Sequence, residues 1–207
     1  MSTAAAQSSV RVVPKQKIAA GPEHAIIPRP EQRPPYLVGQ AHVMAVFPLR
    51  NTALCPADAA CIYGGGGGVL GSIELRWPWG LGLGAQYQAW LLDGNGVHEL
   101  SLQHGLGPLL RYVLPTQTVW HPFAVLSPQW LALGDAPSLP SFGFGLDFGL
   151  GVEIEMSASL SFVAQASSRL FSTRAFTTES DDVRRAGGTE INAALSLHVG
   201  LAIAQIP

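Results

Sequence analysis

Residues 142–156 read FGFGLDFGLGVEIEM, and alternate positions of this stretch differ in character. The residues between the apolar ones are small or acidic, and they include Asp147, Glu153 and Glu155. Successive side chains of a β-strand point to opposite sides, so the stretch predicts a strand with one apolar face. That face must contact either a protein core or lipid, and it is formed by Phe142, Phe144, Leu146, Phe148, Leu150, Val152, Ile154 and Met156.

The composition of the 207 residues excludes several classes of protein. Charged residues make up 13 % of the chain, about half of the ~25 % that is usual for soluble domains. No run of 18 or more apolar residues occurs, so no transmembrane helix is predicted. The net charge of −2 gives no indication of nucleic-acid binding.

The chain divides into an irregular N-terminal part and a part with a period of two. Residues 1–35 contain six prolines and no periodicity, and they predict a disordered or extended arm. Residues 36–207 predict one barrel domain. Its eight strand-like segments lie at about 37–49, 68–77, 80–92, 97–114, 117–131, 142–156, 158–172 and 190–206. The fifth segment is the least regular, and its Pro122 and Pro128 predict a bulge or bend.

The connections between these segments alternate in length. Longer loops are predicted at about 50–67, 132–141 and 173–189, whereas WPWG, LPTQ and MSAS are short turns. The DGNG connection departs from this alternation because it is also short. Tight turns at one end and longer loops at the other are typical of an outer-membrane barrel.

The polar faces of the segments favour lipid as the environment of the apolar faces. The apolar faces of 142–156 and 190–206 carry no charge, and the opposite faces hold Gly, Ser, Gln, Asn and isolated charges with hardly a Lys. A solvated surface carries dense Lys and Glu, whereas a narrow lumen needs small and paired polar residues. The alternative is a soluble lipocalin-like barrel that carries an apolar ligand, with Phe142, Phe144 and Phe148 turned inward.

Charged residues of the polar faces predict a network inside the lumen. An unpaired buried charge is costly, so acids and arginines in one narrow lumen should pair and fill it. A gate or narrow ion path is the other interpretation. The predicted network consists of Glu74, Arg76, Arg111, Asp147, Glu153, Glu155, Arg169 and His198, with His42 and several glutamines nearby.

Aromatic residues near the chain reversals predict two interfacial girdles. Trp77, Trp79, Tyr112 and Trp120 gather at the short-turn end. The girdle at the long-loop end would contain Trp130, Phe142, Phe171 and Phe176.

The two cysteines, Cys55 and Cys61, lie six residues apart in CPADAAC. They predict a small disulfide ring and an oxidising compartment, with two free thiols as the alternative. No His or Cys nearby completes a metal site. The segment MSTAAAQSS lacks the features of a secretory signal, but Ala4-Ala5-Ala6-Gln7 resembles the end of a cleavage site, so we expect a removed signal or a mis-assigned start.

Catalysis is the least supported class of function. A Ser-His-acid set would be required for hydrolysis of lipid acyl chains, and His98, Glu99, Ser101 and His104 are the nearest candidates. No nucleophile motif surrounds them. We therefore expect no enzymatic activity and no cofactor.

The layout of segments 36–207 resembles the small eight-stranded outer-membrane β-barrels of the OmpA-like and opacity-protein type. The resemblance rests on the number of strands, on the alternation of short turns with longer loops, and on the alternation of apolar and polar residues within the strands. It implies an all-β, antiparallel up-and-down transmembrane barrel in a Gram-negative outer membrane, monomeric and bound to the lipid bilayer. Its role would be structural, or surface recognition of an extracellular ligand through loops 50–67 and 173–189.

Overall fold

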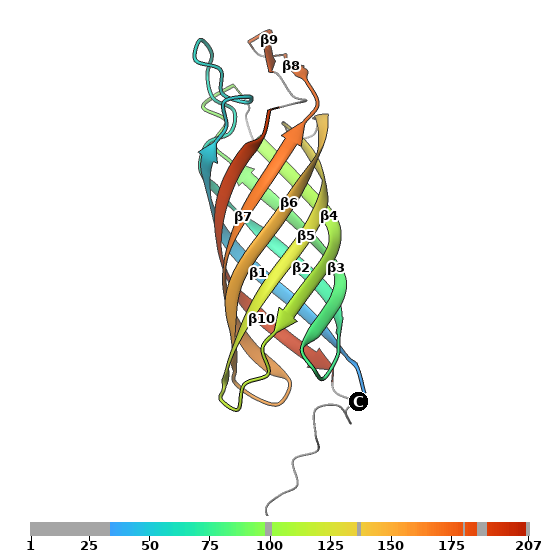
Figure 1. Ribbon diagram of the computed structural model, residues 1–207. Coiled ribbons are helices and arrows are strands. Elements are labelled where there is room, and N and C mark those ends of the chain that lie inside the picture. Colours follow the sequence, from blue (N-terminus) through green and yellow to red (C-terminus); the bar gives the residue numbers. More distant parts are fainter. Residues whose placement is uncertain (1–33, 98–100, 136–137, 180, 186–189, 206–207) are drawn as a thin grey trace, which may run out of the picture.

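Eight long strands form a closed antiparallel barrel (Figure 1). The computed structural model describes residues 34–97, 101–135, 138–179, 181–185 and 190–205. The predicted N-terminal arm therefore lies almost wholly outside the described residues. The barrel strands are β1 (Tyr36–Arg50), β2 (Gly66–Arg76), β3 (Leu81–Leu92), β4 (Ser101–Val113), β5 (Trp120–Asp135), β6 (Ser138–Glu155), β7 (Leu160–Thr173) and β10 (Asn192–Gln205).

The topology is up-and-down, because each strand pairs with its neighbours in the sequence and β1 closes the ring against β10. A short hairpin of β8 (Phe176–Thr178) and β9 (Val183–Arg185) stands apart from the barrel within the last long loop. The predicted fold class is thus confirmed. Among the described residues, no helix is long and apolar enough to cross a membrane.

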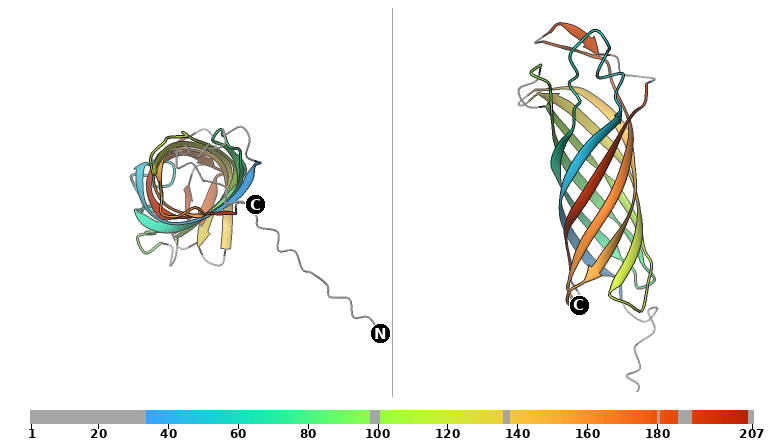
Figure 2. Two further views of the ribbon diagram at one scale, coloured as in Figure 1. Left: turned by 90° about the horizontal axis from the view of Figure 1, so that it is seen from below. Right: turned by 90° about the vertical axis from the view of Figure 1, so that its left-hand side faces the viewer.

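The two ends of the barrel differ, as Figures 1 and 2 show. Three connections, at 77–80, 114–119 and 156–159, lie at one end together with the first residue of β1 and the last residue of β10; we call this the turn end. The 77–80 turn needs a glycine, because Gly80 has a φ of 99°. The connection 51–65 and the β8–β9 hairpin lie at the opposite end, the loop end.

The prediction of a long loop after the fifth strand was wrong. The loop expected at 132–141 is mostly strand, because β5 reaches Asp135 and the ladder with β6 continues through the Leu133–Ser141 pair. Leu133 is fully buried, and burial of this side chain inside the barrel mouth favours extension of the strand.

No register change accompanies the prolines of β5 where it pairs with β4. The pairing resumes in the same register on either side of the point where Pro128 faces Pro108. Ser127 donates its hydroxyl to the carbonyl of Pro108 at 2.6 Å, so this carbonyl has a partner although the ladder lacks two N–H donors. The register irregularity of β5 lies instead between Leu133 and Asp135, against β6.

The faces of the barrel have the inverse of the polarity found in water-soluble proteins. Large apolar side chains point outward, and Phe144 and Leu150 are 66 % and 70 % exposed. Arginines point inward, and Arg111 and Arg169 are 2 % and 1 % exposed. Phe142 and Phe148 are also outside, which is the opposite of what the ligand-carrier alternative requires.

The interior contains two apolar layers in addition to its polar residues. Near the turn end, Val38, Val113, Phe123, Val163 and Ala202 pack together. Near the loop end, Leu54, Ile62 and Tyr63 of the first long loop pack onto inward residues of the barrel wall. A lumen lined by polar residues alone, as the strand pattern predicted, is therefore an incomplete description.

Candidate functional site

Four buried charged residues form an ion cluster across the lumen. Glu74 and Arg76 lie on β2, Arg111 on β4 and Glu153 on β6. Arg76 donates to Glu153 through both terminal nitrogens at 2.7 Å each, and its Nε donates to Glu74 at 2.9 Å. Arg111 donates to Glu153 at 3.0 Å. We call these residues the four-residue cluster.

This cluster bridges opposite walls of the barrel. In the closed ring β2 and β6 are four strands apart in either direction, so the Arg76–Glu153 contact crosses the full lumen. Two arginines face two carboxylates, and their charges cancel. The ring of Phe123 supports the cluster, because the Arg111 guanidinium lies 4.5 Å from its centre.

A second ion pair lies farther toward the loop end. Asp147 precedes Glu153 by six residues on β6, a distance of about 20 Å along a strand. Arg169, directly opposite on β7, donates to both carboxylate oxygens of Asp147 at 2.6 and 2.8 Å. Arg169 also donates to Gln129, and Gln88 donates to Asp147, so residues of β3, β5, β6 and β7 meet here. We call these four residues the Asp147–Arg169 cluster.

Small residues and an aromatic ring accommodate the Asp147–Arg169 cluster. The Arg169 guanidinium lies 3.9 Å from the centre of the Trp90 ring. Gly105 leaves room for the amide of Gln129, with which a Cβ at this position would clash. Glycine on the inward face therefore makes space for long polar side chains.

His198 is buried beside His42 on the neighbouring strand. The two rings are perpendicular with centres 6.2 Å apart. His198 Nε2 lies 2.7 Å from the Ser196 hydroxyl, and His42 Nε2 lies 3.1 Å from the side-chain amide oxygen Oε1 of Gln40. These contacts are made within one strand each, so the histidines line the wall and do not bridge the lumen.

Glu155 does not join the network that the sequence predicted for it. It lies at the rim of the turn end, where its side chain is 49 % exposed and 3.5 Å from His121. The alternation of side chains along a strand fixes whether a residue points into or out of the barrel, but not how far it lies from the barrel end. Glu155 is the last residue of β6. The other seven predicted network residues are buried inside the barrel.

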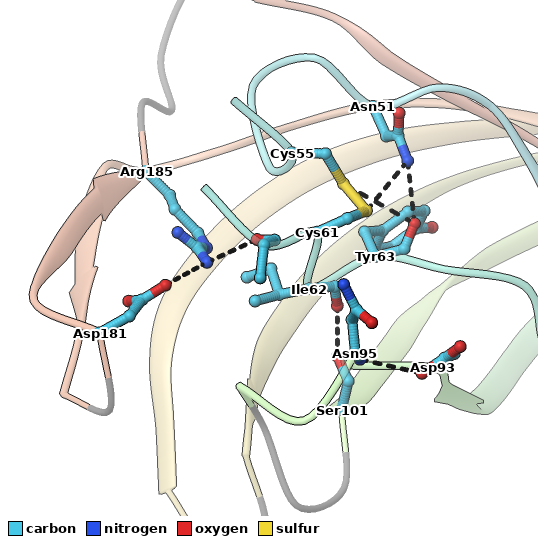
Figure 3. Close-up of a disulfide and its surroundings, with 11 residues drawn as sticks. Asn51, Cys55, Cys61, Ile62, Tyr63, Asp93, Asn95, Ser101, Asp181 and Arg185 are labelled. Atoms are coloured by element: carbon cyan, nitrogen blue, oxygen red, sulfur yellow. Dashed lines mark hydrogen bonds and ion pairs between the residues drawn. A yellow bond between two sulfur atoms is a disulfide. The ribbon is translucent and has the colours of Figure 1, made fainter. Parts of the chain in front are cut away.

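The connection 51–65, here called the loop cap, folds into the loop end of the barrel (Figure 3). A disulfide joins Cys55 to Cys61 within it. Asn51 donates to the carbonyl of Tyr63 at 2.9 Å, and the Ser101 hydroxyl donates to the carbonyl of Ile62 at 2.9 Å. These bonds fix the cap to itself and to β4.

Tyr63 anchors the loop cap inside the lumen. Its hydroxyl donates to Gln103 at 3.1 Å, and its ring packs on Phe171 with 5.2 Å between centres. Complete burial raises the pKa of the Tyr63 hydroxyl, so the group remains a neutral donor. Strand parity gave no signal for this residue, because it lies in a loop.

A second contact joins the loop cap to the β8–β9 hairpin. Arg185 donates to the carbonyl of Ala60 and to the carboxylate of Asp181, each at 2.8 Å (Figure 3). A hydrogen bond from Thr178 is the main cause that lowers the pKa of Asp181. Two long loops that are distant in sequence therefore form one surface.

The predicted girdle at the turn end lies at the surface, but the one at the loop end is smaller than expected. Trp79, Tyr112 and Trp120 are exposed, and the half-buried Trp77 lies 6.5 Å from Trp79 between ring centres. Exposed Trp130 packs beside Phe144 on the outside, with ring centres 6.4 Å apart.

Two residues assigned to the loop-end girdle, Phe171 and Phe176, point inward, and both are buried. Leu170 points outward, so the next residue of the strand, Phe171, points inward. Their assignment to the interface was wrong.

The candidate catalytic residues do not come together in the described part of the chain. His98 and Glu99 lie outside the described residues. His104 is on the outer face, where its Nδ1 lies 2.7 Å from the Tyr87 hydroxyl, whereas Ser101 is buried under the cap. Among the described residues, no group of three His, Cys, Asp or Glu side chains could hold a metal ion.

Solved structures share this fold at low sequence identity. No protein-family model and no curated protein sequence matches the chain. Neisserial surface protein A is 13 % identical over 81 % of this chain and 96 % of its own, with a TM-score of 0.56. The outer membrane protein OprG from Pseudomonas aeruginosa is 12 % identical over 86 % of this chain and 99 % of its own, with a TM-score of 0.57. The chain therefore has the fold of eight-stranded outer-membrane barrels.

Proposed function

We propose that the protein is an integral outer-membrane barrel with a closed lumen, which presents its loop end as a rigid surface outside the cell. The observation that carries the proposal is the inverted polarity of the barrel. An exterior of exposed Phe, Leu, Val and Ile is unfavourable in water and favourable in lipid, while closure satisfies the backbone groups.

A closed lumen is supported by three successive obstructions. The four-residue cluster crosses from β2 to β6, the Asp147–Arg169 cluster links four strands, and the loop cap fills the mouth. Eight-stranded barrels are just wide enough for side chains to fill. The proposed role is thus structural, or recognition of an extracellular ligand by loops 50–67 and 173–189, rather than solute transport.

A recognition role is favoured by the rigidity of the loop end. The disulfide, the cap contacts to β4 and the Arg185–Ala60 bond hold the loops in one arrangement. A preorganised surface loses less conformational entropy on binding than mobile loops do. The exposed acidic side chains of the β8–β9 turn and the exposed Arg184 of β9 are available for such contacts, and no catalytic role is assigned.

Membrane insertion is tested by fractionation combined with gel mobility before and after boiling. An integral barrel stays with the membrane fraction and migrates differently until heated. A monomer that remains soluble without detergent, and whose mobility does not change on boiling, would refute the proposal.

Orientation and closure need separate measurements. A membrane-impermeant maleimide should label Thr177→Cys on intact cells but Ser159→Cys only after lysis, since these exposed residues lie at opposite ends. Planar bilayers should show no stable conductance steps with the purified protein. Reversed labelling would refute the orientation, and regular conductance steps would refute the closed lumen.

A further inference from the structure

A cavity opens at the turn end of the barrel, on the far side of the four-residue cluster from the loop cap. Its volume is about 550 Å³. The floor contains Arg76 and Glu153, and the apolar wall contains Tyr36, Trp77 and Pro115. We call this cavity the vestibule. It is separate from the recognition surface proposed above, and the inference about it does not depend on that role.

The rim of the vestibule carries an acidic side chain that lies outside the four-residue cluster. Glu155 lines it with a half-exposed carboxylate, and its neighbour His121 is 3.5 Å away. On the floor, Glu153 and Arg76 already neutralise each other within the four-residue cluster. A cationic group that entered the vestibule would therefore find Glu155 as its counter-charge.

The sequence places a proline-rich segment that carries Arg29 and Arg33 directly at the vestibule. Pro34 is a lining residue, so the chain preceding it starts at the rim. Residues 1–33 hold five basic and two acidic residues, a net charge of +3, whereas the rest of the chain holds seven basic and twelve acidic residues, a net charge of −5. The part of these residues next to the barrel, 22–33, holds Arg29 and Arg33 with two glutamates, so its own net charge is zero and the contact with the vestibule would be made by an individual arginine.

We propose that segment 22–33, PEHAIIPRPEQR, docks in the vestibule of its own barrel, with Arg29 or Arg33 on Glu155. Proline-rich chains bind grooves lined by aromatic side chains because their extended conformation is already restricted, and Tyr36 and Trp77 provide such a wall. Arg29 lies five residues before Pro34, so an extended chain reaches about 15 Å inward from the rim. Tethering raises the effective concentration of the segment.

The test is disulfide crosslinking in the full-length protein. Ile27→Cys, which keeps both arginines of the segment, is combined with Ser159→Cys in the vestibule wall, and separately with Thr177→Cys at the loop end as a matched exposed control. The native cysteines do not interfere because they are disulfide-bonded. We expect the vestibule pair to form an intrachain crosslink at least about ten times faster than the control pair.

The charge contact is tested in the same assay. Glu155→Lys, or 0.5 M salt, should slow the vestibule crosslink at least about five-fold, because both weaken an exposed ion pair. Glu179→Lys at the loop end is the matched charge change and should leave the rate unaltered. Equal rates for the two cysteine pairs, crosslinks between chains alone, or no effect of Glu155→Lys would each overturn the proposal.

A second measurement needs no cysteine in the vestibule wall. A bimane fluorophore on Ile27→Cys should be quenched by Trp77 in the docked state, and its emission should recover when Trp77→Phe is added. Unquenched bimane in the protein with native Trp77 would contradict docking even if the crosslinking variant failed to fold.

Discussion

Glu153→Gln should destabilise the barrel by about 3 kcal/mol, because it leaves an uncompensated buried charge. Glu153 is 3 % exposed and accepts three hydrogen bonds, two from Arg76 and one from Arg111. The substitution retains the shape of the side chain but removes its charge. Two arginines then face the single carboxylate of Glu74, and their burial leaves little solvent to stabilise the excess charge.

Glu155→Gln is the matched control for this prediction. It lies two residues farther along β6 with the same parity, yet its carboxylate is half exposed and has only a 3.5 Å contact with His121. Exposed pairs of this kind contribute between about 0 and 1 kcal/mol. The two variants therefore make the same chemical change at two depths of one strand.

The assay is reversible urea unfolding in detergent micelles, followed by tryptophan fluorescence. The midpoint should fall clearly for Glu153→Gln and hardly move for Glu155→Gln. The double variant Arg111→Gln/Glu153→Gln restores neutrality and should be less destabilised than the sum of the single changes by about 1 kcal/mol or more. Equal stability of Glu153→Gln and Glu155→Gln would refute the argument that buried charge balance holds the lumen together.

Three further outcomes test other parts of the structure. Arg76→Lys keeps the charge but cannot bridge both carboxylates as the planar guanidinium does, so urea unfolding should show a loss of about 2 kcal/mol, and no loss would mean that charge alone is sufficient. Cys55→Ser should lower the free energy of unfolding by about 2 kcal/mol. Reductant should lower the unfolding midpoint of the native protein but not that of Cys55→Ser. A midpoint that neither the substitution nor reductant changes would contradict a stabilising disulfide. The pKa of Asp181 is lowered first by the hydrogen bond from Thr178 and also by Arg185, so these contacts stabilise the hairpin above the ordinary Asp pKa and are lost as pH falls through the lowered value. The protection factors of the hairpin amides, corrected for the slower intrinsic exchange in acid, should therefore fall at low pH, and constant protection factors would contradict this.

Strand identity and sidedness could be predicted from the sequence because both depend on alternation. The period of two that places Phe144 outside also places Asp147 inside, and the cross-strand pair Asp147–Arg169 follows once the strands are adjacent. This rule operates within a strand and needs no knowledge of the rest of the chain.

Depth and long-range contacts could not be predicted in the same way. The alternation of side chains along a strand assigned Glu155 to the lumen, although the strand ends at this residue. It gave no inward role to Tyr63, because side chains in a loop do not alternate in this way. The Arg185–Ala60 bond joins residues 125 positions apart. Such a contact depends on how two loops are placed relative to each other at the loop end, and no local sequence pattern predicts this placement.

The choice of arginine over lysine connects the composition to the closed lumen. The residues after position 33 contain seven arginines and no lysine. Arg76 donates hydrogen bonds to two carboxylates, Glu74 and Glu153, which lie on opposite walls of the barrel. Arg169 donates to Asp147 and Gln129, and its guanidinium lies over the Trp90 ring. A guanidinium can do this because its donors form a rigid planar fork that also stacks on aromatic rings, whereas an ammonium is a point charge that favours hydration. If the outside of the barrel contacts lipid, as we propose, the interior must supply the partners that water would otherwise provide, and arginine with paired acids supplies them with a net charge of zero.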